Sequence, residues 1–287
     1  MAEINASMIK ELRERTQAGM SDCKNALVEA GGDMEKAVEV ILKKGIVKAA
    51  ARAGKVAAEG EVRTLVSGKR GTIIEVNCQT DFVARGDQFR DFVGKVLDVA
   101  SKLDKGADIG AAKFPGTDQT VDFVRAEMVA KTGENTVIRR WDMLVCNEAG
   151  GIVHSYIHAG GKLAVLVEAH APNDAAAKNP EFVDFVDNCA MQIAAMSPLV
   201  VSKDKVSKAD IDKQREIFQA QMQEEKAAGT LKAPEAAWPK ILDGKISAYF
   251  KEQILLKQPF IKDPSKTIEQ LITETGNSIT AFKIETI

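Results

Sequence analysis

The strongest constraint on the fold is an internal repeat within residues 60–287. Three pairs of segments share residue character and order: 71–76 with 161–166, 89–93 with 182–186, and Thr132-Gly133 with Thr275-Gly276. The first pair is an aliphatic run after a glycine, which is typical of a buried strand, and the third pair precedes another such run. Each copy is therefore expected to hold a hairpin, two helices and a final strand. The repeat predicts two α+β subdomains with antiparallel sheets, over residues 60–145 and 146–287.

The second copy carries an insertion of about 50 residues between its two helices, because the offset between matching segments grows by that amount. The inserted residues, about 205–250, show apolar side chains at helical spacing in two runs. The first run includes Ile211, Phe218 and Met222, and the second extends from Trp238 to Phe250. These runs predict an antiparallel helical hairpin. Its apolar stripe either joins the two arms or, if Trp238 and Phe250 are exposed, forms a homodimer interface.

Residues 1–45 precede the repeat and have the pattern of three short helices. Apolar residues recur at helical spacing from Ile4 to Leu42, Gly31-Gly32 ends the second helix, and Asp33 is placed to cap the third. The pattern resembles a ubiquitin-associated domain, a fold that presents a helical face to a partner protein. Residues 46–59 are rich in alanine and basic side chains, which predicts a linker that is either mobile or partly helical. A nucleic-acid contact there is the alternative interpretation.

The stretch at residues 77–84, with the sequence NCQTDFVA, places an acid and an aromatic ring where a predicted strand ends. The ring of Phe82 either packs under the following helix or stays exposed and enters a partner. Asp81 also has two interpretations, as the N-cap of the following helix or as part of a binding loop. This loop is the leading candidate for a functional site.

The balance of charges and the cysteine pattern limit the kinds of partner and site. The chain has 39 Lys and Arg against 41 Asp and Glu, a net charge of -2, which argues against a protein that mainly binds nucleic acid. The four cysteines form no Cys-x-x-Cys pair, which argues against a zinc ribbon or a disulfide framework and favours reduced thiols in the cytoplasm. The first residues, from Met1 to Asn5, lack an apolar leader and no run of 18 apolar residues occurs, so we expect no contact with a membrane.

The sequence lacks motifs of nucleotide and cofactor chemistry. Gly160-Gly161-Lys162 is followed by Leu163 instead of Ser or Thr, and neither Gly-x-Gly-x-x-Gly nor Gly-x-Ser-x-Gly occurs. We therefore expect no cofactor and no enzyme activity. His154 and His158 share one face of a predicted strand and could hold a metal ion in principle. With three histidines in the chain and no thiolate near this pair, we expect no metal.

Two motifs of the sequence, and their order along the chain, resemble the elongation factor Ts family, whose members are guanine-nucleotide exchange factors for elongation factor Tu. One is the loop NCQTDFVA, and the other is LRERTQAGMSDCKNAL at residues 12–27, followed by Gly32-Asp33. The resemblance implies that the chain binds GDP-bound and nucleotide-free elongation factor Tu and promotes GDP release without a catalytic acid or base. It also implies that the loop from Thr80 to Val83 disturbs the magnesium and phosphate site of that partner.

The resemblance further assigns roles to single residues. Phe82 is implied to enter between partner side chains near the magnesium ion, and Asp81 is implied to fix the loop through hydrogen bonds. Arg13 and Met20 are implied to hold the G domain of the partner from another side. His158 resembles a family position that contacts domain 3 of elongation factor Tu, although a plain surface histidine on a strand is the simpler interpretation.

Two functions of other classes also fit the sequence. The chain would be a helical adaptor if residues 1–44 bind some other partner, and an enzyme if the repeated body holds an unrecognised site. Some relatives use the hairpin as a dimer interface, which leaves the oligomeric state open. Some also continue into a further C-terminal helix where this chain ends at Ile287, so we expect the contacts of that helix to be missing or replaced.

Overall fold

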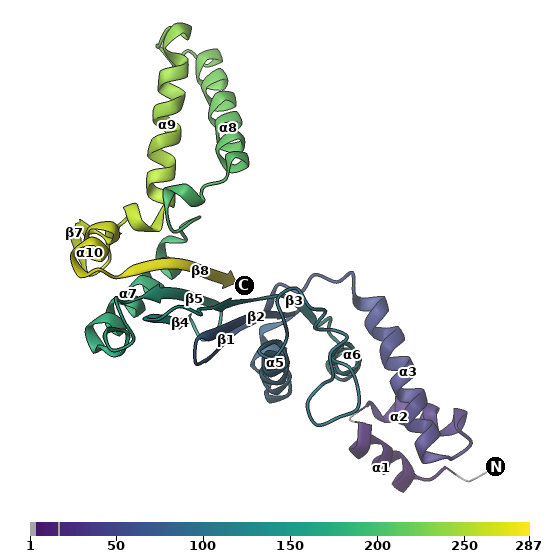
Figure 1. Cartoon of the computed structure of the whole chain (residues 1–287). Coiled ribbons are helices and arrows are strands. Elements are labelled where there is room, and N and C mark those ends of the chain that lie inside the picture. The colour runs from purple at the N-terminus through teal and green to yellow at the C-terminus, as the bar shows by residue number, and fades with distance from the viewer. Residues whose placement is uncertain (1–3, 17) are drawn as a thin grey trace.

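The computed structural model describes residues 4–16 and 18–287 and comprises a helical N-terminal region, two three-stranded sheets and a projecting pair of helices (Figure 1). Residues 1–3 and Gln17, which belong to the N-terminal segment and to the opening motif discussed above, lie outside the described residues. The combination of antiparallel sheets with helices confirms the predicted α+β class. Within the described part of the chain, no helix combines the length and the apolar character needed to span a membrane.

Three helices form the N-terminal region: α1 (Ala6–Thr16), α2 (Met20–Glu29) and α3 (Met34–Arg52). They pack around a core that includes Leu12, Cys23 and Leu27. The glycine pair at 31–32 adopts positive φ angles after α2, a conformation that stops a helix at little steric cost. Asp33 caps α3, because its carboxylate accepts a hydrogen bond from the backbone N–H of Lys36 at 3.1 Å. The predicted stop and the predicted cap are both confirmed.

Helix α3 is longer than the short third helix that the sequence indicated. It continues to Arg52, so the boundary predicted after residue 45 falls inside a helix, and the first part of the predicted linker is helical. Ala49 packs against Ala126 and Val129 of α6 (Val121–Thr132). A side chain on Gly45 would place its Cβ 3.2 Å from that of Ala130. The alanines and glycines of this segment thus permit a close contact between the two helices.

Both sheets are antiparallel, with the strand orders β1-β2-β3 and β4-β5-β8. The strands of the first sheet are β1 (Glu59–Ser67), β2 (Arg70–Cys78) and β3 (Val137–Val145). Those of the second are β4 (Gly151–His158), β5 (Leu163–His170) and β8 (Ser278–Thr286). The predicted repeat is confirmed in its architecture, since each copy has a β-bulge beside its central strand, after Glu75 and after Glu168. These bulges lie 93 residues apart, the offset of the matching helices, so the predicted match of residues 71–76 with 161–166 is wrong by three residues.

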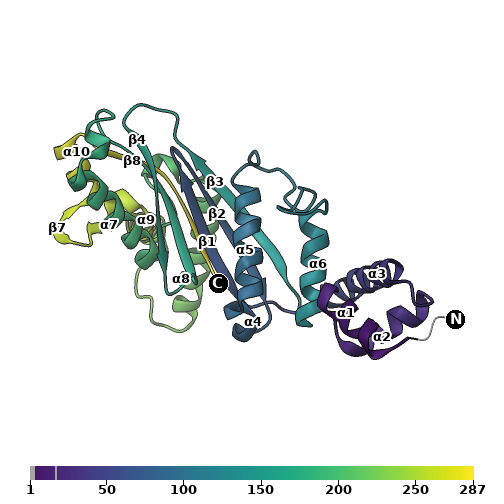
Figure 2. The ribbon, with the colours of Figure 1, turned by 90° about the horizontal axis from the view of Figure 1, so that it is seen from below.

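The covering helices are α5 (Asp87–Ala100) and α6 in the first copy, and α7 (Pro180–Met196) and α10 (Ile268–Thr275) in the second. Alternate residues of each central strand face different layers. On β2, Ile74 packs in the core with α5, whereas Ile73 belongs to a cluster shared by the two sheets. On β5, Val165 packs in the core with α7, whereas Leu166 joins the shared cluster. The layers are therefore helices, sheet, sheet and helices; Figure 2 shows α5 and α6 along the first sheet.

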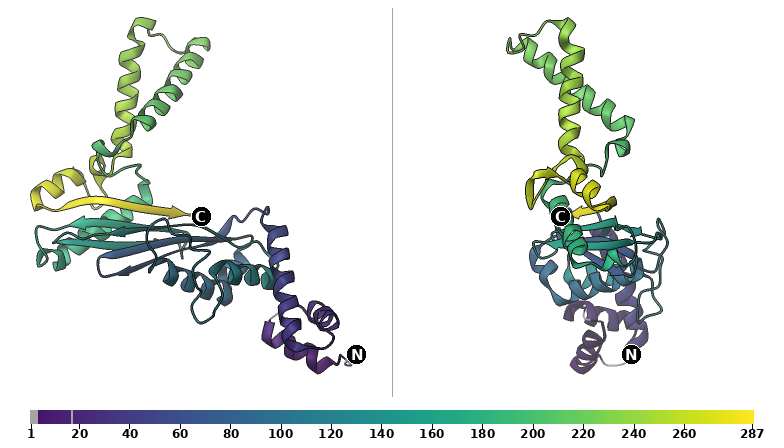
Figure 3. Two further views of the ribbon diagram at one scale, coloured as in Figure 1. Left: turned by 45° about the vertical axis from the view of Figure 1, so that its right-hand side comes forward. Right: turned by 60° about the vertical axis from the view of Figure 1, so that its left-hand side comes forward.

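The insertion forms a helical hairpin of α8 (Lys208–Ala227) and α9 (Trp238–Gln253), which projects from the sheets (Figure 3). Its apolar stripe joins the two arms, because Met222, Leu242 and Phe250 are buried together. Phe250 is buried within the hairpin, so its ring does not meet the condition of exposure on which the predicted homodimer interface depends. Homodimer formation through the hairpin stays a prediction.

The remaining elements are short. A two-stranded sheet of β6 (Pro259–Phe260) and β7 (Asp263–Thr267), which the sequence did not predict, precedes α10. Single 3₁₀ turns are η1 (Ala176–Lys178), η2 (Lys203–Lys205), η3 (Glu235–Ala237) and η4 (Leu255–Lys257). All four cysteines are free and buried, as reduced thiols would be.

Candidate functional site

The loop after β2 contains one turn of helix, α4 (Asp81–Arg85), and Thr80 is its N-cap. The Thr80 hydroxyl oxygen accepts a hydrogen bond from the backbone N–H of Val83 at 3.3 Å. The interpretation of Asp81 as the cap is therefore wrong by one residue: Asp81 is the first helical residue and forms an exposed ion pair with Arg85 at 3.1 Å. The cap fixes the direction of a helix too short to be stable by itself.

The turn of α4 divides its apolar side chains between the core and the solvent. Ala84 is buried and Val83 packs against the core beneath α5, whereas Phe82 points outward. The Phe82 side chain is 84% exposed, more than any other large apolar side chain in the described residues. Of the two interpretations of this ring, packing under the next helix is wrong. An exposed phenyl ring on a fixed loop is typical of a residue that is buried by a partner.

Glu134, which sequence reasoning missed, holds this loop in place. It follows the left-handed glycine that ends α6, and one carboxylate oxygen accepts hydrogen bonds from the backbone N–H groups of Gln79 at 3.2 Å and Thr80 at 3.0 Å. The other oxygen accepts the Thr80 hydroxyl at 2.7 Å. Glu134 therefore fixes the loop within this chain, and the role that the resemblance gives to Asp81 stays a prediction. The register of β2 with β3, which pairs Asn77 with Val137, places residues 134–135 opposite residues 79–80.

Asn135 connects the same loop to the end of the helical region. Its backbone N–H donates to the Gln79 side-chain oxygen at 2.9 Å, and its buried side-chain amide donates to the carbonyl of Lys55 at 2.8 Å. The segment that follows α3 and the loop that carries Phe82 thus share one anchoring residue.

Cys78 lies at the base of the loop, and its thiol donates to the Thr80 carbonyl at 3.2 Å. Burial, with a further contribution from the negative charge of Glu134, raises the pKa of Cys78 to about 12. The thiol is therefore protonated at neutral pH and is a poor nucleophile or metal ligand. Its role is to support the backbone of the loop.

The turn after β4 lies at the same end of the sheets as the Phe82 loop. The backbone N–H of Val62 donates to the carbonyl of Gly161 at 2.7 Å, and Lys162 forms an ion pair with Glu59, the residue opposite Cys78 in the first sheet. His158 ends β4 at this turn and is exposed, with its Nδ1 atom 2.9 Å from the Tyr156 hydroxyl.

The other histidine of the suggested metal pair has a different environment. His154 lies 3.0 Å from a carboxylate oxygen of Asp187 on α7, so the two imidazoles have separate partners. Arg13 and Met20 are exposed on α1 and α2, on the other side of α6 from α4 (Figure 2). The structure thus brings His158 and the Phe82 loop to one end of the sheets and leaves Arg13 and Met20 in a separate helical unit.

Comparison with known proteins gives one consistent result. The family model described as Elongation factor TS matches residues 79–286, beginning in the Phe82 loop. A protein named Elongation factor Ts from Clostridium perfringens (strain SM101 / Type A) is 42% identical over 280 residues, which cover 96% of this chain and 88% of the relative. The protein of the same name from Clostridium kluyveri is 39% identical, with 97% and 89% covered. The one from Nitratidesulfovibrio vulgaris is 40% identical, with 96% and 91% covered.

Proposed function

This chain belongs to the elongation factor Ts family and is a translation elongation factor, and we propose that it promotes release of GDP from elongation factor Tu. The observation that carries this proposal is the exposed ring of Phe82 on a loop fixed by Glu134. Such a side chain contributes little to the core of its own chain but is held in one place, which suits a residue that inserts into a partner protein.

Exchange by this route depends on linkage between two binding events. This chain and GDP are each expected to weaken the binding of the other to elongation factor Tu. Because such coupling is reciprocal, binding of this chain lowers the affinity for GDP by the same ratio by which GDP lowers the affinity for this chain. The partner can be engaged in its GDP-bound and its nucleotide-free form, and no bond in the nucleotide is made or broken. The chain therefore acts as a binding protein and needs no cofactor of its own.

The loop from Thr80 to Val83 is the part that acts on the nucleotide site. Magnesium requires near-octahedral oxygen ligands and bridges the phosphates to the protein, so a small displacement of its surroundings loosens GDP. Phe82 enters between partner side chains beside this site. The hydrogen bonds of Glu134 order the loop before binding, which lowers the entropy cost of forming the complex.

The other predicted contacts lie on two further surfaces. Arg13 and Met20, exposed on the helical unit, hold the G domain, and His158 contacts a second domain of elongation factor Tu. Because His158 and the Phe82 loop lie at one end of the sheets, the same approach of the partner reaches both. The place of action is the cytoplasm, with no contact to membrane or nucleic acid.

The test is the release of a fluorescent GDP from elongation factor Tu with this chain and with its Phe82→Ala variant. Burying a phenylalanine contributes about 1.5–3 kcal/mol, so its loss should slow stimulated release at least tenfold. The matched control is Met196→Ala, which truncates another exposed apolar side chain, at the end of α7.

Both variants should melt within a degree or so of the parent, because neither side chain is packed. Release stimulated to the parent level by a folded Phe82→Ala variant would overturn the assignment of this ring. Failure of the parent chain to stimulate release would overturn the proposed function.

A further inference from the structure

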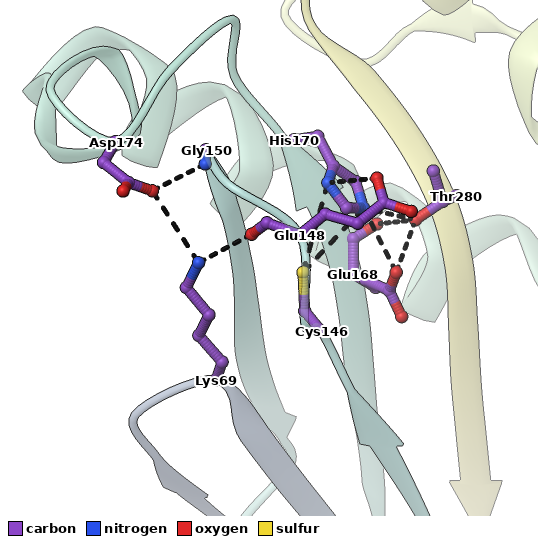
Figure 4. Close-up of polar contacts among 8 residues, drawn as sticks. All are labelled: Lys69, Cys146, Glu148, Gly150, Glu168, His170, Asp174 and Thr280. Carbon is purple, nitrogen blue, oxygen red and sulfur yellow. Dashed lines mark hydrogen bonds and ion pairs between the residues drawn. The ribbon is translucent and has the colours of Figure 1, made fainter.

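A second cluster of polar side chains lies at the opposite end of the two sheets (Figure 4). Cys146 follows β3 and is buried in the layer between the sheets. Glu168 and His170 are two positions apart on β5, so their side chains point to the same layer. The Cys146 sulfur lies 3.9 Å from Nε2 of His170, and a Glu168 carboxylate oxygen lies 3.1 Å from the same nitrogen. One donor atom from each residue falls within 4.8 Å of the other two.

The second sheet adds a fourth polar group to this cluster, the side-chain hydroxyl of Thr280. The bulge between β5 and β8 leaves Thr280 unpaired, and its hydroxyl lies 3.1 Å from Nε2 of His170 and 3.0 Å from the Glu168 carboxylate. Bulges commonly redirect a side chain into a site. On the other ring nitrogen, Glu148 lies 3.6 Å from Nδ1. The imidazole therefore has an oxygen acceptor on each side.

The turn that carries Cys146 is fixed from both subdomains. The Lys69 ammonium donates to the carbonyl of Glu148 at 2.6 Å, and the Asp174 carboxylate accepts the backbone N–H of Gly150 at 2.6 Å. The backbone N–H of Cys146 donates to the carbonyl of Lys69 at 2.9 Å. The thiol is thus held by a network that does not depend on a ligand in the cluster.

A glycine provides the space that the sulfur and the imidazole share. Gly151 pairs with His170 across the sheet, and a Cβ atom on this glycine would lie 2.0 Å from the Cys146 sulfur and 3.0 Å from Nδ1 of His170. Any other residue would force the thiol out of the cluster. The cluster therefore depends on a residue without a side chain at position 151.

The repeat provides a comparison for Glu168. Its counterpart before the bulge of the first copy is Glu75, whose buried carboxylate lies 2.5 Å from Arg140 and 3.7 Å from Arg139. Glu168 occupies the same position on β5, but its contacts are His170 and Thr280. Where the first copy supplies permanent positive charge from arginine, the second supplies an imidazole, a hydroxyl and a thiol. A cation in the second cluster would balance the Glu168 carboxylate as arginine balances Glu75.

We propose that Cys146, Glu168 and His170 bind a zinc ion that links the two sheets. Zinc takes sulfur at about 2.3 Å and nitrogen or oxygen at about 2.0–2.2 Å, so two ligand atoms of one ion lie no more than about 4.4 Å apart. Nε2 of His170 meets this limit with the Cys146 sulfur, at 3.9 Å, and with the Glu168 carboxylate, at 3.1 Å. A thiolate, an imidazole and a carboxylate form a borderline-soft set that suits zinc. The Thr280 hydroxyl or a water molecule completes the tetrahedron, and Glu148 accepts the Nδ1 proton that orients the ring.

The proposed zinc site differs from the sequence-based expectation of no metal. That expectation considered His154 and His158, which have no neighbouring thiol. The proposed ligands lie on two segments, Cys146 after β3 and Glu168 with His170 on β5, and the packing of the two sheets brings these segments together.

The first experiment measures metal binding by the full chain after treatment with a chelator. Zinc is titrated in competition with a chromophoric indicator, and cobalt serves as a spectroscopic probe of sulfur coordination. We expect one saturable site and a thiolate-to-cobalt charge-transfer band. Cys146→Ser should abolish the band, and His170→Gln should weaken zinc binding at least tenfold.

Matched controls separate this site from the other thiols and imidazoles. Cys189→Ala removes another buried thiol, and His154→Gln removes another imidazole of the second sheet, so both should bind zinc and cobalt as the parent does. If His170→Gln fails to fold, as judged by circular dichroism, Glu168→Gln replaces it as the test of a ligand. Absence of saturable zinc binding by the folded parent, or binding unchanged by the ligand variants, would overturn the proposal.

A second readout uses the position of the site. β2 and β5 run in opposite directions between the two ends of the sheets, and nine residues of strand span about 30 Å, so the cluster lies far from Phe82. Zinc should therefore raise the melting temperature of the parent by several degrees, leave that of Cys146→Ser unchanged, and leave GDP release by the parent at its metal-free rate. Equal effects of zinc on the melting of the parent and of Cys146→Ser would exclude these ligands, whatever the outcome for exchange.

Discussion

Glu134→Ala should release the Phe82 loop without changing the ring itself. The substitution removes three hydrogen bonds, two to backbone N–H groups and one to the Thr80 hydroxyl. A hydrogen bond to a charged group contributes about 1.5–3 kcal/mol, but Thr80 is exposed and its freed groups can bond to water, so the contributions do not add in full. We expect the free energy that stabilises the ordered loop to fall by about 1–3 kcal/mol in total.

The same energy sets the expected loss of exchange. If the loop has its present conformation in the complex, a loop that is disordered in the free variant must be ordered again on binding. The cost of about 1–3 kcal/mol then corresponds to about a fivefold to 150-fold loss of stimulated GDP release. Glu134→Gln keeps one carbonyl acceptor and should give an intermediate rate. The control is Glu274→Ala, which removes an exposed carboxylate near the end of α10, the counterpart of α6 in the second copy.

Two measurements check this prediction. Hydrogen exchange at the amides of Gln79 and Thr80 should accelerate in Glu134→Ala and stay unchanged in Glu274→Ala. Fluorescent GDP release should fall in the same order as amide protection across the three variants. Faster amide exchange with unaltered GDP release would refute the reasoning, because it would show that order in the loop is not needed for its action.

Two further predictions concern the hairpin and the N-terminal helices. Replacing residues 205–250 by a short Gly/Ser bridge should leave a folded chain that retains exchange at least in part, because the first copy closes without such an element. Size-exclusion chromatography should show a dimer become a monomer if the hairpin is its interface. Complete loss of exchange would make the hairpin part of the partner-binding surface. The hydrogen bond from the Lys36 N–H lowers the pKa of Asp33 in the folded chain, so the cap stabilises α3 at any pH above the unfolded pKa near 3.8. This stability is lost as the pH falls through the lower pKa of the folded chain. The melting temperature of Asp33→Ala should therefore be below that of the parent at neutral pH, and the difference should vanish in strong acid.

The repeat predicted the sheets because strand pairing and layer packing both follow from a period of two residues. Ile73 and Ile74 face opposite layers, as do Val165 and Leu166, so both faces of each central strand are buried, and the sequence shows this as a continuous aliphatic run. The length of α3 was not predicted, because its last part lacks the large apolar side chains that mark a helical stripe. Gly45 and Ala49 pack closely on α6 because they are small, and small residues give a weak periodic signal.

The candidate site was predictable in position but not in detail. The end of a strand and the polar run after it placed the loop, whereas exposure of Phe82 depends on how one turn of helix is rotated. That rotation is set by the Thr80 cap and by Glu134, which is distant in sequence. The same limit applies to Cys146 and His170, because they belong to different sheets and their proximity depends on how the two sheets pack.

The antiparallel packing of the two copies explains why one fold has two different ends. β2 leads into the Phe82 loop, and its counterpart β5 runs the other way and ends at His170. The connection after the central strand is thus the same element of the repeat in both copies, but it lies at opposite ends of the sheets. In the first copy it carries the exposed ring of Phe82, and in the second it begins beside the cluster of Cys146, which follows β3, with Glu168 and His170 of β5. Because each sheet spans the whole distance between these ends, a cation at Cys146 and His170 would hold the sheets together at the end away from the Phe82 loop. The Phe82 end could then bind and release elongation factor Tu on a scaffold whose inner layer stays closed.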